Sequence, residues 1–203
     1  MAYDTFGPEC AVLNGQSDSA TSNGEHSSID SEAEVNEAQI MVRALGPRDR
    51  RAAMGLINTA AEWYAEFLPP SEVHEPEMTL QGWAEEARRM TWYGAFDGVD
   101  LVGVMGLEYA GGAALLRHAY VLPDRQRKGV AAMLLNHLER DVAGVDTIIV
   151  GTYAANYKAR AAFEKAGYQL SSDSEAVLRR YYDIPKDRLQ SSVTYEKHID
   201  RER

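Results

Sequence analysis

Residues 117–131 combine residue types that could bind a phosphorylated ligand. The segment reads RHAYVLPDRQRKGVA, so strand-forming residues lead into a short loop, and a helix is expected to begin at Lys128-Gly129. The first amides of a helix have no partner within it and lie at the positive end of its dipole, so they attract anions. A glycine there lets a ligand approach the backbone. The segment therefore predicts a diphosphate site.

The spacing of residues 126–131 decides which diphosphate ligand fits. The letters QRKGVA match neither the Walker pattern G-x4-G-K-[ST] nor the dinucleotide pattern G-x-G-x-x-G. They match Q/R-x-x-G-x-G/A instead. Val121-x-Pro123 precedes this pattern, and a second segment, NYKARAAFEKAGY, follows at residues 156–168, where the spaced positions are Asn156, Ala159, Phe163, Gly167 and Tyr168.

Together these two segments resemble the GNAT superfamily of acyl-CoA-dependent N-acetyltransferases, over roughly residues 40–197. The resemblance implies that backbone amides bind the diphosphate of acetyl-CoA, that the pantetheine arm pairs with the preceding strand, and that no metal is needed. Arg125, Arg127 and Lys128 would add electrostatic attraction. The positions that carry over for the cofactor are Ala119, Tyr120, Val121, Arg127, Lys128, Gly129, Val130, Ala131, Ala132 and Asn156.

Transfer to an amine needs a group that removes a proton, and Glu108 is the predicted base. A two-residue hairpin at Gly111-Gly112 would pair Glu108 with Leu115 and Gly106 with Arg117. Family bases often sit at positions matching Leu115 or Arg117, and Glu108 could reach the same space. The alternatives are that Glu108 is an exposed glutamate at a strand end, or that it pairs with Arg117, which could instead bind a substrate carboxylate.

Two other positions bear on catalysis. Many family members have a tyrosine where this chain has Phe163, and that tyrosine protonates the leaving sulfur. Its absence would slow the reaction by about 10²–10⁴-fold without abolishing it, and water or another tyrosine could substitute. Strand alternation predicts that His118 points to the face opposite Arg117, in a structural role.

Hydrophobic periodicity predicts the elements that position these residues. Helices are expected from Pro47 to before Pro69, over Thr79–Met90, over Lys128–Gly144, over Asn156–Ala166 and around Glu175–Tyr182. Strands are expected over Ile40–Ala44, Tyr93–Phe96, Leu101–Tyr109, Ala113–Val121, Thr147–Val150, Tyr168–Leu170 and around Ser192–Glu196. This order matches an α/β (α+β) protein of the GNAT fold, with a mixed central sheet of six to seven strands flanked by helices, over residues 39–199.

Charge is distributed unevenly along the chain. Residues 1–39 contain eight acidic side chains and no Lys or Arg, and so account for −8 of the net charge of −10. Residues 1–38 are predicted to be a disordered acidic tail. The remainder is nearly neutral, which gives no argument for nucleic-acid binding, and no stretch is long and apolar enough for a membrane helix. Cys10 is the sole cysteine, which fits a cytoplasmic location.

The sequence thus predicts an acetyl-CoA-dependent N-acetyltransferase that acts directly on a primary amine of a small molecule or amino-acid-like acceptor. A homodimer is compatible with this interpretation. The alternatives are a non-catalytic acyl-CoA-binding or regulatory module and a protein or peptide N-acetyltransferase. Two segments resemble a GNAT subgroup without an assigned substrate, namely HEPEM at residues 74–78 and LRRYYDIPKDRLQ within an insertion at residues 173–190. The insertion could either line or block a peptide groove.

Overall fold

The computed structural model describes residues 40–182, 184 and 186–199, so the predicted tail at residues 1–38 lies outside the described residues. Within the described chain, seven strands form one mixed sheet in the order β1-β2-β3-β4-β5-β7-β6. Neighbours are antiparallel except for the central pair, β4 and β5, which are parallel. The strands are β1 (Met41–Ala44), β2 (Met90–Asp97), β3 (Asp100–Ala110), β4 (Ala113–Val121), β5 (Thr147–Tyr153), β6 (Gln169–Leu170) and β7 (Ser192–His198).

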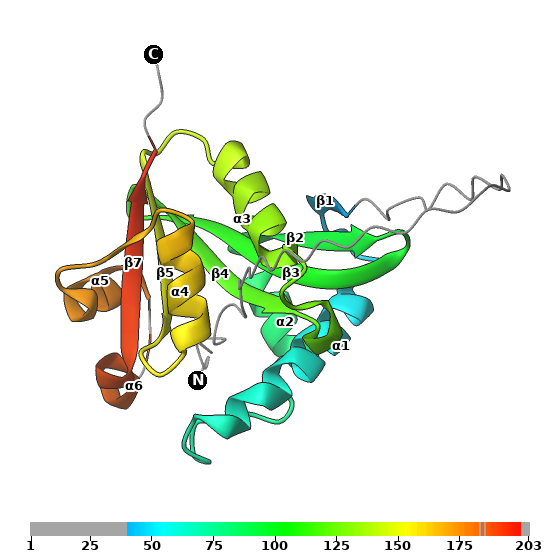
Figure 1. Ribbon diagram of the computed structural model, residues 1–203, viewed down its shortest axis with the longest axis horizontal. Coiled ribbons are helices and arrows are strands. Elements are labelled where there is room, and N and C mark those ends of the chain that lie inside the picture. Colours follow the sequence, from blue (N-terminus) through cyan, green and yellow to red (C-terminus); the bar gives the residue numbers. More distant parts are fainter. Residues whose placement is uncertain (1–39, 183, 185, 200–203) are drawn as a thin grey trace, which may run out of the picture.

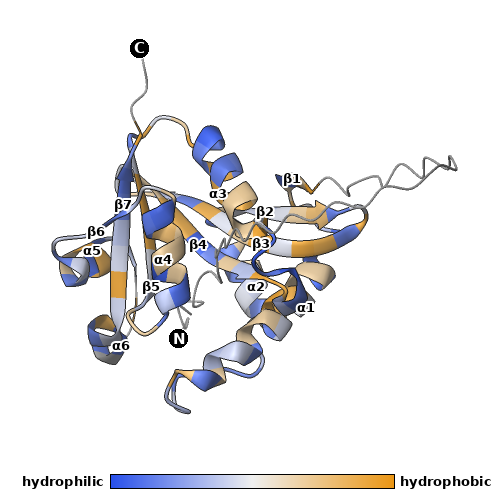
Figure 2. Cartoon of the chain, viewed as in Figure 1, coloured by the Kyte–Doolittle hydropathy of each residue, from blue (hydrophilic) through white to orange (hydrophobic). Residues whose placement is uncertain are grey.

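Helices cover both faces of this sheet (Figure 1). One face packs against α3 (Val130–Asp141) and α4 (Tyr157–Lys165), in a core that includes Leu134, Leu138 and Phe163. The strands in the middle of the sheet carry apolar residues along most of their length (Figure 2).

The opposite face, called here the acceptor face, packs against the other helices, and these form two separate apolar clusters with the sheet. They are α1 (Arg50–Ala61), the 3-10 helix η1 (Glu62–Glu66), α2 (Leu80–Glu86), α5 (Ser174–Tyr181) and α6 (Lys186–Ser191).

The predicted mixed sheet flanked by helices is confirmed, as is the pairing of the central hairpin. Ala110 pairs with Ala113, Glu108 with Leu115 and Gly106 with Arg117. This register follows from the turn, because Gly111 and Gly112 both have positive φ (56° and 85°), which a tight two-residue hairpin requires.

Some predicted element ends differ from those observed. The second helix ends at Glu86, and Met90 is already in β2, whose buried apolar residues pack on the sheet. Helix α3 begins at Val130 rather than Lys128, because Gly129 is left-handed (φ 79°) and ends the preceding turn. Helix α6 was not predicted, since its six residues, KDRLQS, are too short and too polar to show a period.

Among the described residues, no helix is long and apolar enough to cross a membrane. The same residues contain no cluster of three His, Cys, Asp or Glu side chains that could hold a metal ion.

Candidate functional site

The central parallel pair of strands opens at one end. In the described chain, the ladder between β4 and β5 runs from Ala114↔Ile148 to Leu116↔Val150 and stops there. Both strands continue beyond that point, β4 to Val121 and β5 to Tyr153, and they diverge (Figure 1). The sheet therefore has an opening at its centre, on the side of β4 that faces β5, where a ligand could add as an extended strand. At its far end the carbonyl of Val121 accepts a hydrogen bond from the side chain of Gln126 (3.3 Å).

A β-bulge in β4 lies at the mouth of this opening. Gly106 pairs with Arg117 but Val104 pairs with Tyr120, so β4 has an extra residue there, and His118 takes a positive φ of 52°. In a bulge, two successive side chains can point to the same face. Arg117 and His118 do so, and both reach Glu86 of α2. The prediction that His118 points away from Arg117 is therefore wrong.

The bulge also determines to which face of the sheet the side chains of residues 119–121 point. After it, Ala119 and Val121 pack in the core under α3, whereas Tyr120 points to the acceptor face and joins the core with α1. All three are buried in β4 alongside the opening. Strand β4 thus contributes its backbone to the opening and the side chain of Tyr120 to the acceptor face.

The predicted diphosphate turn lies where β4 runs into α3. Gly129 precedes the helix, and a Cβ atom built on it would meet no atom within 4 Å, so the space above it is open. The amides of Val130, Ala131 and Ala132 form the first turn of α3 and have no acceptor within the helix. This arrangement fits a diphosphate.

The cations around this turn differ in their surroundings. Arg127 and Lys128 are exposed beside the turn, as the predicted role requires. Arg125 instead forms an ion pair with Asp97 at the end of β2 and lies 3.4 Å from Asp124. These carboxylates compete with a diphosphate for Arg125, whose predicted attraction stays a prediction.

Asn156 and Phe163 occupy different environments on α4. Asn156 is fully buried, and its side-chain oxygen accepts a hydrogen bond from the amide of Ala159 (3.1 Å), so it caps the helix beside the opening. Phe163 is 1% exposed and packs against the rings of Tyr168 and Tyr195. At this position the chain has a core aromatic and no phenol.

The predicted base, Glu108, lies where the sheet is still closed. It pairs with Leu115, which itself pairs with Ile149 of β5. Its carboxylate lies 3.0 Å from Arg117 and 4.0 Å from Arg89. These contacts favour the alternative in which Glu108 pairs with Arg117, and its role as a base stays a prediction.

Glu86 is the centre of this buried polar cluster. It lies 3.2 Å from His118 and 2.6 Å from Arg89, and Arg117 lies 4.0 Å away. Burial alone would raise the pKa of Glu86, but the contacts with His118, Arg117 and Arg89 outweigh it and lower the pKa to about 2. Burial also lowers the pKa of His118. The cluster holds a permanent carboxylate that fixes the bulge.

On the acceptor face, a hollow of about 310 Å³ lies between α1 and the segment that precedes α2. Its lining is Asn58, Ala61, Glu62, Val73, His74, Glu75, Pro76 and Glu77. Asn58 of α1 holds the segment before α2 in place through two hydrogen bonds with the backbone of Met78. Its side chain accepts one from the Met78 amide (2.7 Å) and donates one to the Met78 carbonyl (3.2 Å).

Glu77 is the buried member of this lining. It is 9% exposed and accepts a hydrogen bond from the hydroxyl of Tyr120 (3.2 Å). Burial raises the pKa of Glu77 to about 7, against the hydrogen bond from Tyr120 and the charge of Arg188, which both lower it. Sequence reasoning missed Glu77, because nothing local marks one glutamate of the HEPEM segment as buried.

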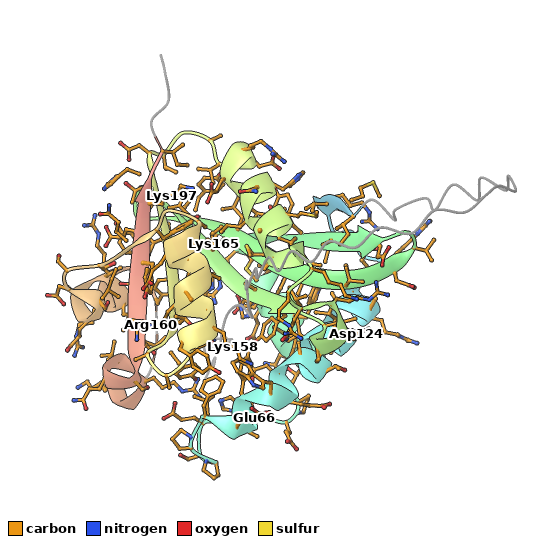
Figure 3. The ribbon with its side chains drawn as sticks, viewed as in Figure 1. Glu66, Asp124, Lys158, Arg160, Lys165 and Lys197 are labelled. Atoms are coloured by element: carbon orange, nitrogen blue, oxygen red, sulfur yellow. The ribbon has the colours of Figure 1, made fainter. Side chains whose placement is uncertain are left out.

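The start of α4 contacts η1, which follows α1. There the ammonium of Lys158 lies 4.1 Å from the centre of the Trp63 ring, and Trp63 donates a hydrogen bond to Glu66 (3.0 Å). Figure 3 shows Lys158 and Glu66 reaching toward the same space from α4 and η1. The segment from 62 to 66 therefore flanks the opening on the acceptor side.

The comparisons with known proteins agree with this geometry. The model of the acetyltransferase (GNAT) family matches residues 57–168, and the chain belongs to this family of acetyl-CoA-dependent N-acetyltransferases. A comparison with curated protein sequences finds no match.

Solved structures share the fold at low identity. The PaiA N-acetyltransferase from Thermoplasma acidophilum, in complex with coenzyme A, is 18% identical with a TM-score of 0.63, covering 79% of this chain and 99% of that chain. The ribosomal-protein-S18-alanine N-acetyltransferase from Escherichia coli is 20% identical with a TM-score of 0.58, covering 81% and 96%. N-acetylglutamate synthase from Neisseria gonorrhoeae, complexed with coenzyme A and N-acetyl-glutamate, is 15% identical with a TM-score of 0.58, covering 82% and 36%.

Proposed function

We propose that this protein transfers the acetyl group of acetyl-CoA to a primary amine of a small molecule or an amino-acid-like acceptor. The observation that carries the proposal is the opening between β4 and β5, which begins after Leu116↔Val150 and leads to the open turn at Gly129. A strand edge next to a helix start with free amides suits a ligand with an amide-containing arm and a diphosphate.

The residues present fit this co-substrate. The amides of residues 127–132 would hold the diphosphate, Arg127 and Lys128 would add charge, and β4 from Ala119 to Val121 would bind the arm. The thioester supplies an activated acetyl carbonyl. Asn156 supports this side of the site by fixing the first turn of α4.

The acceptor side favours a small molecule over a folded protein. The two segments that flank it are bridged, because Arg188 of α6 lies 2.5 Å from His74. A peptide chain passing between them would have to break this contact, whereas the hollow of about 310 Å³ matches the lower end of small-molecule sites. The Escherichia coli protein of similar fold is named for a ribosomal-protein substrate. The experiment must therefore distinguish a small-molecule acceptor from a protein acceptor.

A non-catalytic acyl-CoA-binding module is the second candidate, and one observation favours it. Phe163 lies in the core where many family members have an acidic phenol. Tyr153, which is buried at the end of β5 near the opening, is the hydroxyl that could replace it.

The experiment is release of free thiol from acetyl-CoA across a panel of amino acids, polyamines, aminoglycosides and peptides. Turnover with a small amine supports the proposal and eliminates the module. Turnover with peptides alone would move the assignment to a protein acceptor. Binding of acetyl-CoA without turnover of any amine would favour the module.

A further inference from the structure

Two segments that the cofactor site does not use come together on the acceptor face. They are residues 74–78 (HEPEM) and the insertion at 173–190. Arg188 from the insertion is 6% exposed and contacts His74 at 2.5 Å, and its charge acts on Glu77. Segments far apart in the chain thus enclose a single buried carboxylate.

This carboxylate lines the hollow and accepts a hydrogen bond from a residue of β4. Glu77 lines the hollow beside α1, and behind it the packing against Tyr64 and Tyr153 leaves no room for a water molecule. Its hydrogen-bond donor, Tyr120, belongs to the stretch of β4 that borders the opening. A small amine in the hollow would therefore contact Glu77, whose carboxylate is linked through Tyr120 to the strand that borders the opening.

We propose that Glu77 is the base that removes the proton from the acceptor amine, with Tyr120 as the residue that positions its carboxylate. This inference rests on the proposed transferase function. In the reaction the ammonium gives one proton to Glu77, and the neutral nitrogen attacks the thioester carbonyl. A C–N bond forms, the C–S bond breaks, and the second proton from nitrogen goes to the departing thiolate. Glu77 then releases its proton to water.

The charge state of Glu77 suits this role. A base is most effective when its pKa lies near the working pH, and burial brings the pKa of Glu77 to about 7. Glu108, by contrast, is held by Arg117 in the closed part of the sheet. The other charged and titratable groups around Glu77 are Glu62, Tyr64, Glu72, His74, Glu75, Tyr120, Tyr153 and Arg188.

The test compares Glu77→Gln with the full-length wild type, using acetyl-CoA and an amine that the wild type acetylates. The wild type should gain activity as pH rises through about 7, since the carboxylate form is the active one. Glu77→Gln should lower kcat by about 10²–10⁴-fold and abolish this pH dependence. Its affinity for coenzyme A should be unchanged, which also shows that the variant is folded. Glu85→Gln, a change at a partly exposed position on α2, is the matched control.

A second variant tests the positioning role. The hydrogen bond from Tyr120 lowers the pKa of Glu77, so Tyr120→Phe should keep activity at high pH but move the rise in activity to higher pH. A purely structural tyrosine would not move the profile. Retention of the wild-type rate and pH profile in Glu77→Gln would overturn the inference while leaving the transferase function intact. A wild type that acetylates no amine would overturn both.

Discussion

Two buried glutamates on the acceptor face have opposite electrostatic surroundings. Glu86 contacts His118, Arg89 and Arg117, which together keep its pKa near 2 despite burial, whereas burial dominates at Glu77 and raises its pKa to about 7. Groups whose surroundings push their pKa values apart take different roles in a site. Glu86 stays charged and holds the bulge, and Glu77 can exchange a proton near neutral pH.

The raised pKa of Glu77 has a stability consequence with a definite sign. The folded protein holds this proton up to about pH 7, but the unfolded chain loses it near 4.5, so Glu77 destabilises the fold progressively as pH rises between these values. Glu77→Gln removes the ionisable group. Its unfolding free energy, relative to wild type, should therefore increase by about 2–3 kcal/mol between pH 5 and pH 8. Urea unfolding of both proteins at pH 5 and pH 8 measures this difference in unfolding free energy. A difference that is the same at both pH values would contradict the burial of this carboxylate.

Glu108→Gln distinguishes the two candidate bases. The ion pair with buried Arg117 (3.0 Å) would lose its charge, so we expect unfolding to become easier by about 1–3 kcal/mol. The pH profile of turnover should keep its shape, because Glu77 is untouched. A profile that loses its rise near pH 7 in Glu108→Gln would return the role of base to Glu108.

At the scale of elements, the turn chemistry of β3 and β4 was predictable but the bulge was not. Gly111-Gly112 fixes the hairpin register, and three predicted pairs follow from it. The bulge at His118 depends on Glu86 of α2, which no local pattern of β4 reveals. Simple alternation therefore assigned His118 to the wrong face.

The start of α3 supports a matched pair of substitutions. Gly129→Glu places bulk and negative charge where the diphosphate is expected, so coenzyme A affinity should fall by on the order of 100-fold or more. Gly144→Glu is the control, because Gly144 also has a positive φ (74°) and open space but follows the other end of α3. Calorimetric titration of both variants tests this, and equal affinities would place the diphosphate elsewhere.

At the scale of the whole molecule, the two halves of the site were not equally predictable. The co-substrate half is local, since a strand, a turn and a helix start lie within residues 119–132, and their spacing together with the segment at 156–168 was enough to predict it. The acceptor half joins residues from α1, the HEPEM segment, β4 and α6, including Asn58, Glu77, Tyr120 and Arg188. Their proximity depends on tertiary packing, which the hairpin geometry used to select Glu108 does not describe.

The central claim is that acetyl-CoA lies in the opening between β4 and β5 and against the first turn of α3. Amide hydrogen exchange, measured with and without coenzyme A, tests this location directly. We predict slower exchange in residues 117–133 on addition of coenzyme A, with no change in β1 or in the hairpin end of β3. Unchanged exchange over residues 117–133 at saturating coenzyme A would contradict the claim.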